Sequence, residues 1–215
     1  MDVVVLIFDD LTTLDAIGPL EVLARLPEAK VRIVAKTPGT VRAGRGSGGL
    51  GLVADAAIAD IGHADILLVP GGFGAEPLCE DKAVLDWLRA LHETTTWTTS
   101  VCTGSLLLGA AGLLEGLPAT THWAAMERLA GYGALPRHER VVSTGKIVTA
   151  AGVSAGIDMA LHLAEHVADR DTAEMLQLQI EYDPQPPFDS GSIAKAPAAI
   201  RTKAEALSRK LRETD

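Results

Sequence analysis

Short runs of aliphatic residues alternate with segments of helical periodicity along most of the chain. Residues 3–8 and 66–69 are almost entirely aliphatic, which is typical of strands buried on both faces of a sheet. Residues 14–26 carry apolar side chains at helical spacing, with Pro19 near the expected helix start, where proline is tolerated. In chain order, the pattern predicts strands at 3–8, 31–35, 66–69 and 98–101, hairpins within 38–52 and at 140–150, and helices at 14–26, 82–92, 105–114, 122–130, 154–168 (with Ser154 as the N-cap) and 172–182.

The alternation of strands and helices with short connections containing glycine indicates an α/β fold. We expect a flavodoxin-like three-layer sandwich, with a mostly parallel central sheet and helices on both faces. Ligands of such folds bind at the carboxyl ends of the strands. Three strand ends carry unusual residues here, namely the segment after Phe8, the Gly71-Gly72 pair and Cys102.

The C-terminal region has a different pattern. Prolines at 184, 186 and 187 preclude a helix over 183–191, whereas 199–211 resumes an amphipathic helical pattern. We expect one domain over 1–215, in which a proline-rich arm and a terminal helix occupy 183–215. This arm either wraps around its own domain or embraces a second subunit, and the sequence leaves both open.

Composition narrows the class of protein. Hydrophobic residues make up 47% of the chain but aromatic residues only 4%, so the core must consist mainly of small aliphatic side chains. The net charge of −9 argues against a partner that is nucleic acid or an anionic membrane surface. The N-terminus lacks the basic region of a signal peptide, and two cysteines do not form a disulfide framework. We therefore expect a cytoplasmic protein with reduced thiols.

Cys102 is the strongest candidate for chemistry. It ends a strand-like run, and small residues then open a helix, which is the layout of a nucleophile elbow. Free backbone N–H groups and the positive end of a helix dipole favour the thiolate. The competing interpretation is a small buried hydrophobic residue, but the polar neighbours Thr103 and Ser105 favour the nucleophile.

A cysteine nucleophile needs a partner for proton transfer. Asp15 follows the first strand among apolar residues, where a carboxyl group has a raised pKa, although an N-cap role is equally compatible with its position. Gly71 and Gly72 can bring backbone N–H groups to an oxyanion, or form a plain turn. His122 is either a Cys–His partner or a helix-start histidine with a structural hydrogen bond.

No metal or cofactor is expected. His162 and His166 lie four residues apart, but no third ligand completes a His-Glu-x-x-His pattern around them, which argues against zinc. The glycine-dense segment 44–49 neither follows a buried strand nor opens a helix, so it does not fit a dinucleotide-binding loop. Cys79 is expected to be a spectator.

Several motifs together resemble the PfpI-like branch of the class I glutamine amidotransferase-like superfamily. The branch-wide motifs are Pro70-Gly71-Gly72, Val101-Cys102-Thr103-Gly104 and His122, and the resemblance runs over nearly the whole chain. Within this branch the chain is similar to the isocyanide hydratases, and the segments that carry this similarity are Leu14-Asp15, Gly18-Pro19, 100–105, 119–123, 154–158 and the tail from Gln177 to Phe188.

This resemblance implies hydration of a small uncharged isocyanide to an N-formamide without a cofactor. It implies that Cys102 is the nucleophile, that Asp15 is the general acid and base, and that Thr103 positions the water or Asp15. Backbone N–H groups near Gly72 and Thr103 would stabilise the negative charge that develops during the reaction. The resemblance also implies a homodimer. An oxidative-stress sensor and a glyoxalase or deglycase are the alternatives within the superfamily.

Two departures from other members of the branch bear on activity. Protease-like members carry a histidine directly after the nucleophile, where this chain has Thr103, and deglycase-like members use a glutamate where it has Asp15. Members that regulate transcription append a helix-turn-helix region, whereas only one helix is expected after the proline-rich arm. We therefore expect neither a peptidase nor a DNA-binding protein.

Overall fold

The structure, a computed structural model, describes residues 1–44 and 49–213. The chain divides into two compact units, Met1–Ile180 and Glu181–Asp215, which are considered separately below. Part of the glycine-dense segment 44–49 lies outside the described residues.

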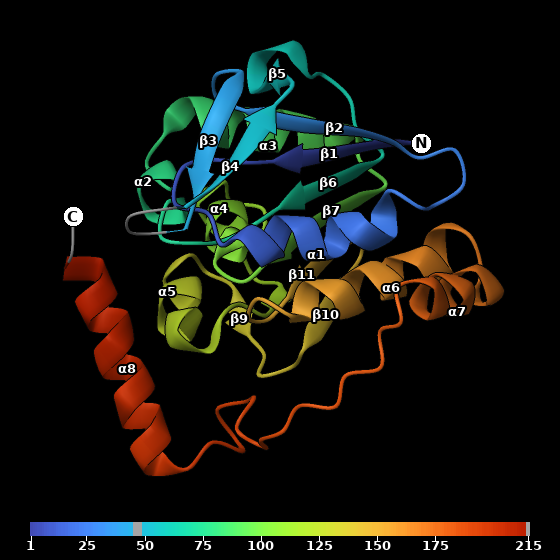
Figure 1. Cartoon of the computed structure of the whole chain (residues 1–215). Coiled ribbons are helices and arrows are strands. Elements are labelled where there is room, and N and C mark those ends of the chain that lie inside the picture. Colours follow the sequence, from blue (N-terminus) through green and yellow to red (C-terminus); the bar gives the residue numbers. More distant parts are fainter. Residues whose placement is uncertain (45–48, 214–215) are drawn as a thin grey trace. The chain divides into compact units, whose positions relative to one another are not determined.

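A seven-stranded sheet forms the centre of the first unit, in the order β10-β11-β7-β6-β1-β2-β5 (Figure 1). All neighbouring strands are parallel except β10, which is antiparallel to β11. The strands of this sheet are β1 (Asp2–Leu6), β2 (Lys30–Ala35), β5 (Ala56–Ala57), β6 (Ile66–Val69), β7 (Trp97–Val101), β10 (Val141–Thr144) and β11 (Ile147–Ala150). Two small two-stranded sheets pair β3 (Gly39–Ala43) with β4 (Leu50–Ala54) and β8 (Pro118–Ala119) with β9 (Leu135–Pro136).

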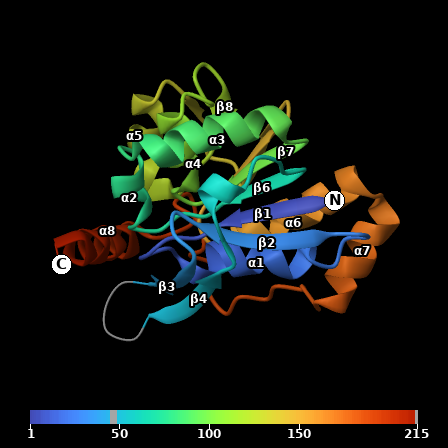
Figure 2. The same ribbon diagram turned by 90° about the horizontal axis from the view of Figure 1, so that it is seen from above.

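Helices cover both faces of the sheet (Figure 2). One face is covered by α1 (Thr13–Leu23) and α6 (Ala155–Val167), and the other by α3 (Lys82–Thr94) and α4 (Gly104–Ala110). The remaining helices of this unit are α2 (Ala75–Leu78), α5 (Met126–Gly131), α7 (Arg170–Gln179) and the 3-10 turns η1 (Ile58–Asp60) and η2 (Trp123–Ala125). The predicted three-layer α/β sandwich with a mostly parallel sheet is thus confirmed.

The aliphatic runs lie where the pattern predicts them. Every residue of β6 is buried, and so are Val3 to Leu6 of β1, because helices pack against both faces of these central strands. No helix in the described part of the chain is long and apolar enough to cross a membrane.

Helix boundaries differ more from the prediction. Pro19 lies inside α1 and not in its first turn, so the carbonyl of Asp15 lacks its usual i+4 donor. The segment 122–130 is divided between η2 and α5, and the predicted helix 105–114 ends at Ala110. Ser154 occupies the N-cap position of α6 but caps no backbone N–H with its side chain. Tertiary packing decides these details, since local pattern places helix ends only approximately.

The second unit contains the helix α8 (Ala198–Glu213), preceded by residues 181–197 without helix or strand. The prolines at 184, 186 and 187 account for the absence of helix over 183–191, as predicted. Ile200, Leu207 and Leu211 are 45%, 58% and 37% exposed, so the described surface of α8 carries an apolar stripe.

Two glycines allow α1 and α6 to approach closely. A Cβ atom on Gly156 would lie 2.8 Å from Cγ of Pro19 and 3.0 Å from Cγ2 of Val101, and one on Gly18 would lie 3.1 Å from Cγ1 of Ile157. The helix that carries Asp15 is therefore held against α6 and β7 at a separation that only glycine permits.

We predict that Gly156→Ala lowers the free energy of unfolding by about 1–3 kcal/mol, because the added methyl group overpacks this contact. Denaturant unfolding monitored by circular dichroism measures the change. Gly131→Ala is the control, since a Cβ atom there meets nothing within 4 Å in the last turn of α5. Equal stability of Gly156→Ala and the wild-type protein would contradict the prediction.

Candidate active site

The site forms where three adjacent parallel strands end. Because β7, β6 and β1 are neighbours in the sheet, the segments that follow them meet at one edge. Cys102 follows β7, Gly71 and Gly72 follow β6, and Asp15 lies in α1 after β1. The structure thus brings together the residues that the sequence placed at separate strand ends.

Cys102 lies on the sharp turn between β7 and α4. Its φ angle is 56°, in the left-handed region, which costs a residue other than glycine about 1–3 kcal/mol. Backbone contacts hold this conformation in place: the Cys102 N–H donates to the carbonyls of Ala150 (3.1 Å) and Ala151 (2.8 Å). The Cys102 carbonyl accepts from the hydroxyls of Ser105 at 3.2 Å and Thr121 at 2.9 Å.

Asp15 is a fully buried carboxyl group. It is the third residue of α1, not its N-cap, so the interpretation of Asp15 as an N-cap is wrong. The N–H of Gly71 donates to Oδ2 at 3.0 Å, while Oδ1 has no hydrogen-bond partner among the described residues. Burial raises the pKa of Asp15 to about 7, against the opposing effects of the Gly71 N–H and the Cys102 side chain. This carboxyl group can therefore take up or release a proton near neutral pH.

Cys102 and Asp15 titrate as a pair. The thiol is only 5% exposed, and burial together with the nearby Asp15 charge raises the pKa of Cys102 to about 12, while N–H groups of Val153 and Thr103 lower it. The expectation that the turn alone favours the thiolate is wrong, because loss of solvation outweighs the backbone N–H groups. Between the two pKa values the pair holds one proton, and transfer from sulfur to carboxylate generates the thiolate inside the site.

The Thr103 side chain makes hydrogen bonds to Gly72, in the segment after β6. Its hydroxyl accepts from the Gly72 N–H at 2.9 Å and donates to the Gly72 carbonyl at 3.1 Å. A Cβ atom on Gly71 would lie 2.4 Å from the Thr103 nitrogen, so this close approach requires glycine. The Gly72 N–H is therefore occupied and not available to an oxyanion, contrary to the sequence-based expectation. Thr103 contacts Gly72, the residue after the Gly71 whose N–H donates to Asp15.

His122 has structural contacts. Its Nδ1 accepts from the Ala124 N–H at 3.3 Å at the start of η2, and its ring lies 5.3 Å from that of Trp123. The preceding residue, Thr121, makes the hydrogen bond to Cys102. The sequence reasoning missed Thr121 and Val153, and only the proximity of Thr121 to His122 in the sequence pointed toward the former.

Cys79 and the potential metal ligands lie apart from this constellation. The Cys79 thiol donates to the Ala75 carbonyl at 3.3 Å in α2. Among the described residues, two groups place three ligand atoms within 4.8 Å of one another, and neither includes Cys102 or Asp15. One of them adds Glu165 to His162 and His166, which corrects the expectation that this pair lacks a third ligand.

We predict that the stability of the protein falls as pH rises from about 4 to about 7, by up to about 4 kcal/mol, because the folded state binds the Asp15 proton more tightly than the unfolded chain. Asp15→Asn removes the ionisable group and should abolish this dependence of the free energy of unfolding on pH. Chemical denaturation at several pH values measures that free energy. The exposed Asp60→Asn is the control, and an unchanged slope in Asp15→Asn would refute the assignment.

Comparisons with known proteins agree with this architecture. A model of the DJ-1/PfpI family matches residues 1–166. An isonitrile hydratase of Pseudomonas putida is 47% identical over 195 residues, covering 91% of this chain and 84% of that protein. The transcriptional regulator CdhR of Pseudomonas aeruginosa is 33% identical over 69% of this chain and 44% of its own length. The crystal structure of a THiJ/PfpI family protein from Pseudomonas syringae has a TM-score of 0.92 and 37% identity, covering 99% of this chain and 87% of that one. The chain therefore belongs to the DJ-1/PfpI family.

Proposed function

We propose that this protein is a cofactor-independent isocyanide hydratase that converts isocyanides to N-substituted formamides. The observation that carries the proposal is the buried pair of Cys102 and Asp15, which supplies a nucleophile and a proton donor in one site. The relative from Pseudomonas putida, whose name states this activity under the synonym isonitrile, supports the same substrate class.

The first step forms a covalent thioimidate. Asp15 takes the Cys102 proton, and the sulfur lone pair then attacks the terminal carbon of R–N≡C, which carries its own lone pair. Asp15 returns the proton to that carbon as the C≡N bond becomes C=N, and the product is R–N=CH–S–Cys102. A carboxyl group with a pKa of about 7 suits this two-way transfer.

Water completes the reaction. Asp15 removes one proton from water as the water oxygen adds to the thioimidate carbon, and Asp15 passes that proton to the nitrogen. Collapse of the adduct R–NH–CH(OH)–S–Cys102 breaks the C–S bond and releases R–NH–CHO, while the hydroxyl proton of the adduct goes through Asp15 to the departing thiolate and restores the Cys102 thiol. The buried Oδ1 of Asp15, which has no hydrogen-bond partner among the described residues, is the atom we assign to this water. Thr103 holds the Gly71-Gly72 backbone that orients Asp15.

Burial of the thiol disfavours a sensor of oxidation. Cysteines that sense oxidants are accessible and have low pKa values, whereas Cys102 is 5% exposed and its pKa is raised. A reducing compartment, the cytoplasm, suits a catalytic thiol of this kind.

We predict that formamide production from cyclohexyl isocyanide rises with pH through an apparent pKa of about 7, as Asp15 becomes able to accept the thiol proton. Cys102→Ala should lower kcat/KM at least about 1000-fold, and Asp15→Asn about 100-fold with loss of the titration, since each removes one half of the pair. Product detection by mass spectrometry, with trapping of a Cys102 adduct, measures both effects.

Cys79→Ala is the matched control, because it removes the other thiol and should leave turnover unchanged. Equal turnover by Cys102→Ala and the wild-type protein would eliminate the covalent mechanism. Lactate formation from methylglyoxal with no formamide would favour the glyoxalase alternative.

We also propose a homodimer that uses the proline-rich arm and terminal helix of 183–215. The exposed apolar stripe of Ile200, Leu207 and Leu211 supports an interface on α8. Sedimentation velocity at micromolar concentration should give twice the 22.5 kDa chain mass, and Leu207→Glu should shift the protein toward monomer. A monomer at every concentration would contradict this proposal.

A further inference from the structure

A second cluster of chemically active side chains lies on α6. His162, Glu165 and His166 each offer a ligand atom, and these atoms lie within 4.8 Å of one another. Residues at positions i, i+3 and i+4 share one face of a helix, which explains the convergence. The order here is His-x-x-Glu-His, the reverse of the His-Glu-x-x-His pattern.

Hydrogen bonds to the protein orient both imidazoles. Nδ1 of His166 lies 2.8 Å from the carbonyl of His162, which can only accept, so Nδ1 carries the proton and Nε2 keeps its lone pair. Nε2 of His162 lies 3.1 Å from the hydroxyl of Ser143 in β10, which accepts from Nε2 in the tautomer that leaves the lone pair of Nδ1 free for a metal. Metal-binding histidines in proteins show this arrangement, in which one ring nitrogen binds the metal and the other donates to the protein.

The surroundings also favour a cation. The cluster occupies the last turns of α6, where the negative end of the helix dipole stabilises positive charge. The ring of Trp97 contacts His166 edge to face, with centroids 5.7 Å apart, and the two histidine rings are 4.3 Å apart. Tetrahedral zinc with bonds of 2.0–2.1 Å spaces its ligand atoms about 3.3 Å apart, so closing the site requires shifts of about 1.5 Å or less. Exposed Glu165 and His166 can make these shifts by side-chain rotation.

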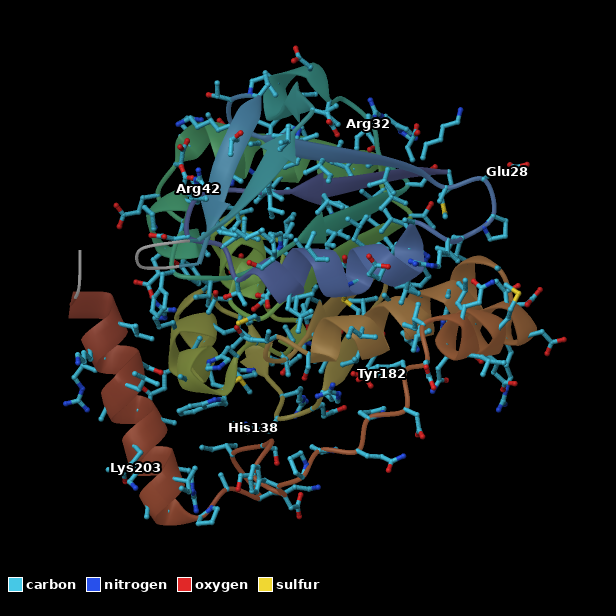
Figure 3. All side chains as sticks on the ribbon, in the orientation of Figure 1. Glu28, Arg32, Arg42, His138, Tyr182 and Lys203 are labelled. Carbon is cyan, nitrogen blue, oxygen red and sulfur yellow. The ribbon has the colours of Figure 1, made fainter. Side chains whose placement is uncertain are left out.

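The other candidate group consists of Asp2, His63 and Asp65, and its carboxylates already have partners in the protein. Oδ2 of Asp65 accepts from the Asp2 backbone N–H at 2.7 Å, and Oδ1 lies 3.6 Å from His63. Arg32, labelled in Figure 3, places its guanidinium 3.8 Å from the Asp2 carboxylate, where it competes with a metal ion. This group is therefore the weaker site.

We propose that His162, Glu165 and His166 bind a divalent transition metal ion of the zinc class, with the fourth coordination position left to water. Two imidazoles and one carboxylate form a ligand set that zinc accepts and that magnesium does not prefer. Trp97 opens β7 and Cys102 follows its end, so five residues of strand, about 16 Å, separate the two sites. The metal site is thus distinct from the proposed catalytic pair.

Isothermal titration of the untagged full chain with zinc chloride tests this inference. All titrations use the Cys102→Ala background, which removes the catalytic thiol as a zinc ligand. We expect one zinc ion per chain, with affinity lowered at least about 100-fold in His166→Ala and at least about 10-fold in Glu165→Gln and Ser143→Ala. Cobalt should give the visible absorption of a site with nitrogen ligands, and this absorption should disappear in His166→Ala.

His138→Ala is the matched control, because His138 is an exposed imidazole between β9 and β10 (Figure 3) and its loss should leave zinc affinity unchanged. Since His162 is half-buried and its replacement can perturb folding, the exposed His166 and Glu165 decide the outcome. Zinc binding that survives in His166→Ala, that disappears in His63→Ala, or that magnesium matches in affinity would overturn the proposal.

Discussion

The loss of solvation at Asp15 is the physical constraint on which the site depends. A carboxyl group with no exposed surface is expensive to ionise, and Cys102 beside it is nearly as buried. Two such groups cannot both be charged, so they hold a proton between them over a wide range of pH. The same burial that makes the isolated thiol a poor acid makes its neighbour a base of suitable strength. In the proposed mechanism, reactivity thus comes from the pair and not from the turn alone.

Backbone groups around Cys102 and Asp15 fix the positions of these two side chains. The N–H of Gly71 is the backbone donor to Asp15, and the Thr103 hydroxyl holds Gly72 through both its N–H and its carbonyl. A Cβ atom on Gly104 would lie 2.1 Å from the Val69 carbonyl, so the loops after β6 and β7 touch through glycine backbone. Small residues at the strand ends therefore let two loops orient a carboxyl group without a second charged residue.

The helix α6 connects the two ends of the sheet. Near its start, Gly156 packs against Pro19 of the helix that carries Asp15. Just before α6, the N–H of Val153 lowers the pKa of Cys102. Near its end, His166 of the histidine and glutamate cluster contacts Trp97, the first residue of β7. One helix thus supports the proposed catalytic pair at the carboxyl edge of the sheet and presents the proposed metal ligands at the opposite edge.

Sequence pattern alone determined the central strands β1, β2, β6 and β7, their parallel arrangement, and the three strands that Asp15, Gly71 and Cys102 follow, because burial on both faces leaves an aliphatic run. The two-residue strands β5, β8 and β9 are too short to leave such a run. The pattern could not determine which interactions each side chain makes at the strand ends. Only tertiary structure decided that Asp15 is a buried acid and not an N-cap, that Thr103 occupies the Gly72 N–H, and that Thr121 reaches the Cys102 carbonyl. These outcomes depend on distances between segments far apart in the chain, and on solvation, which no local pattern encodes. The thiol shows this most clearly: sequence predicted a helix start that favours the thiolate, and burial reversed the sign of its pKa shift.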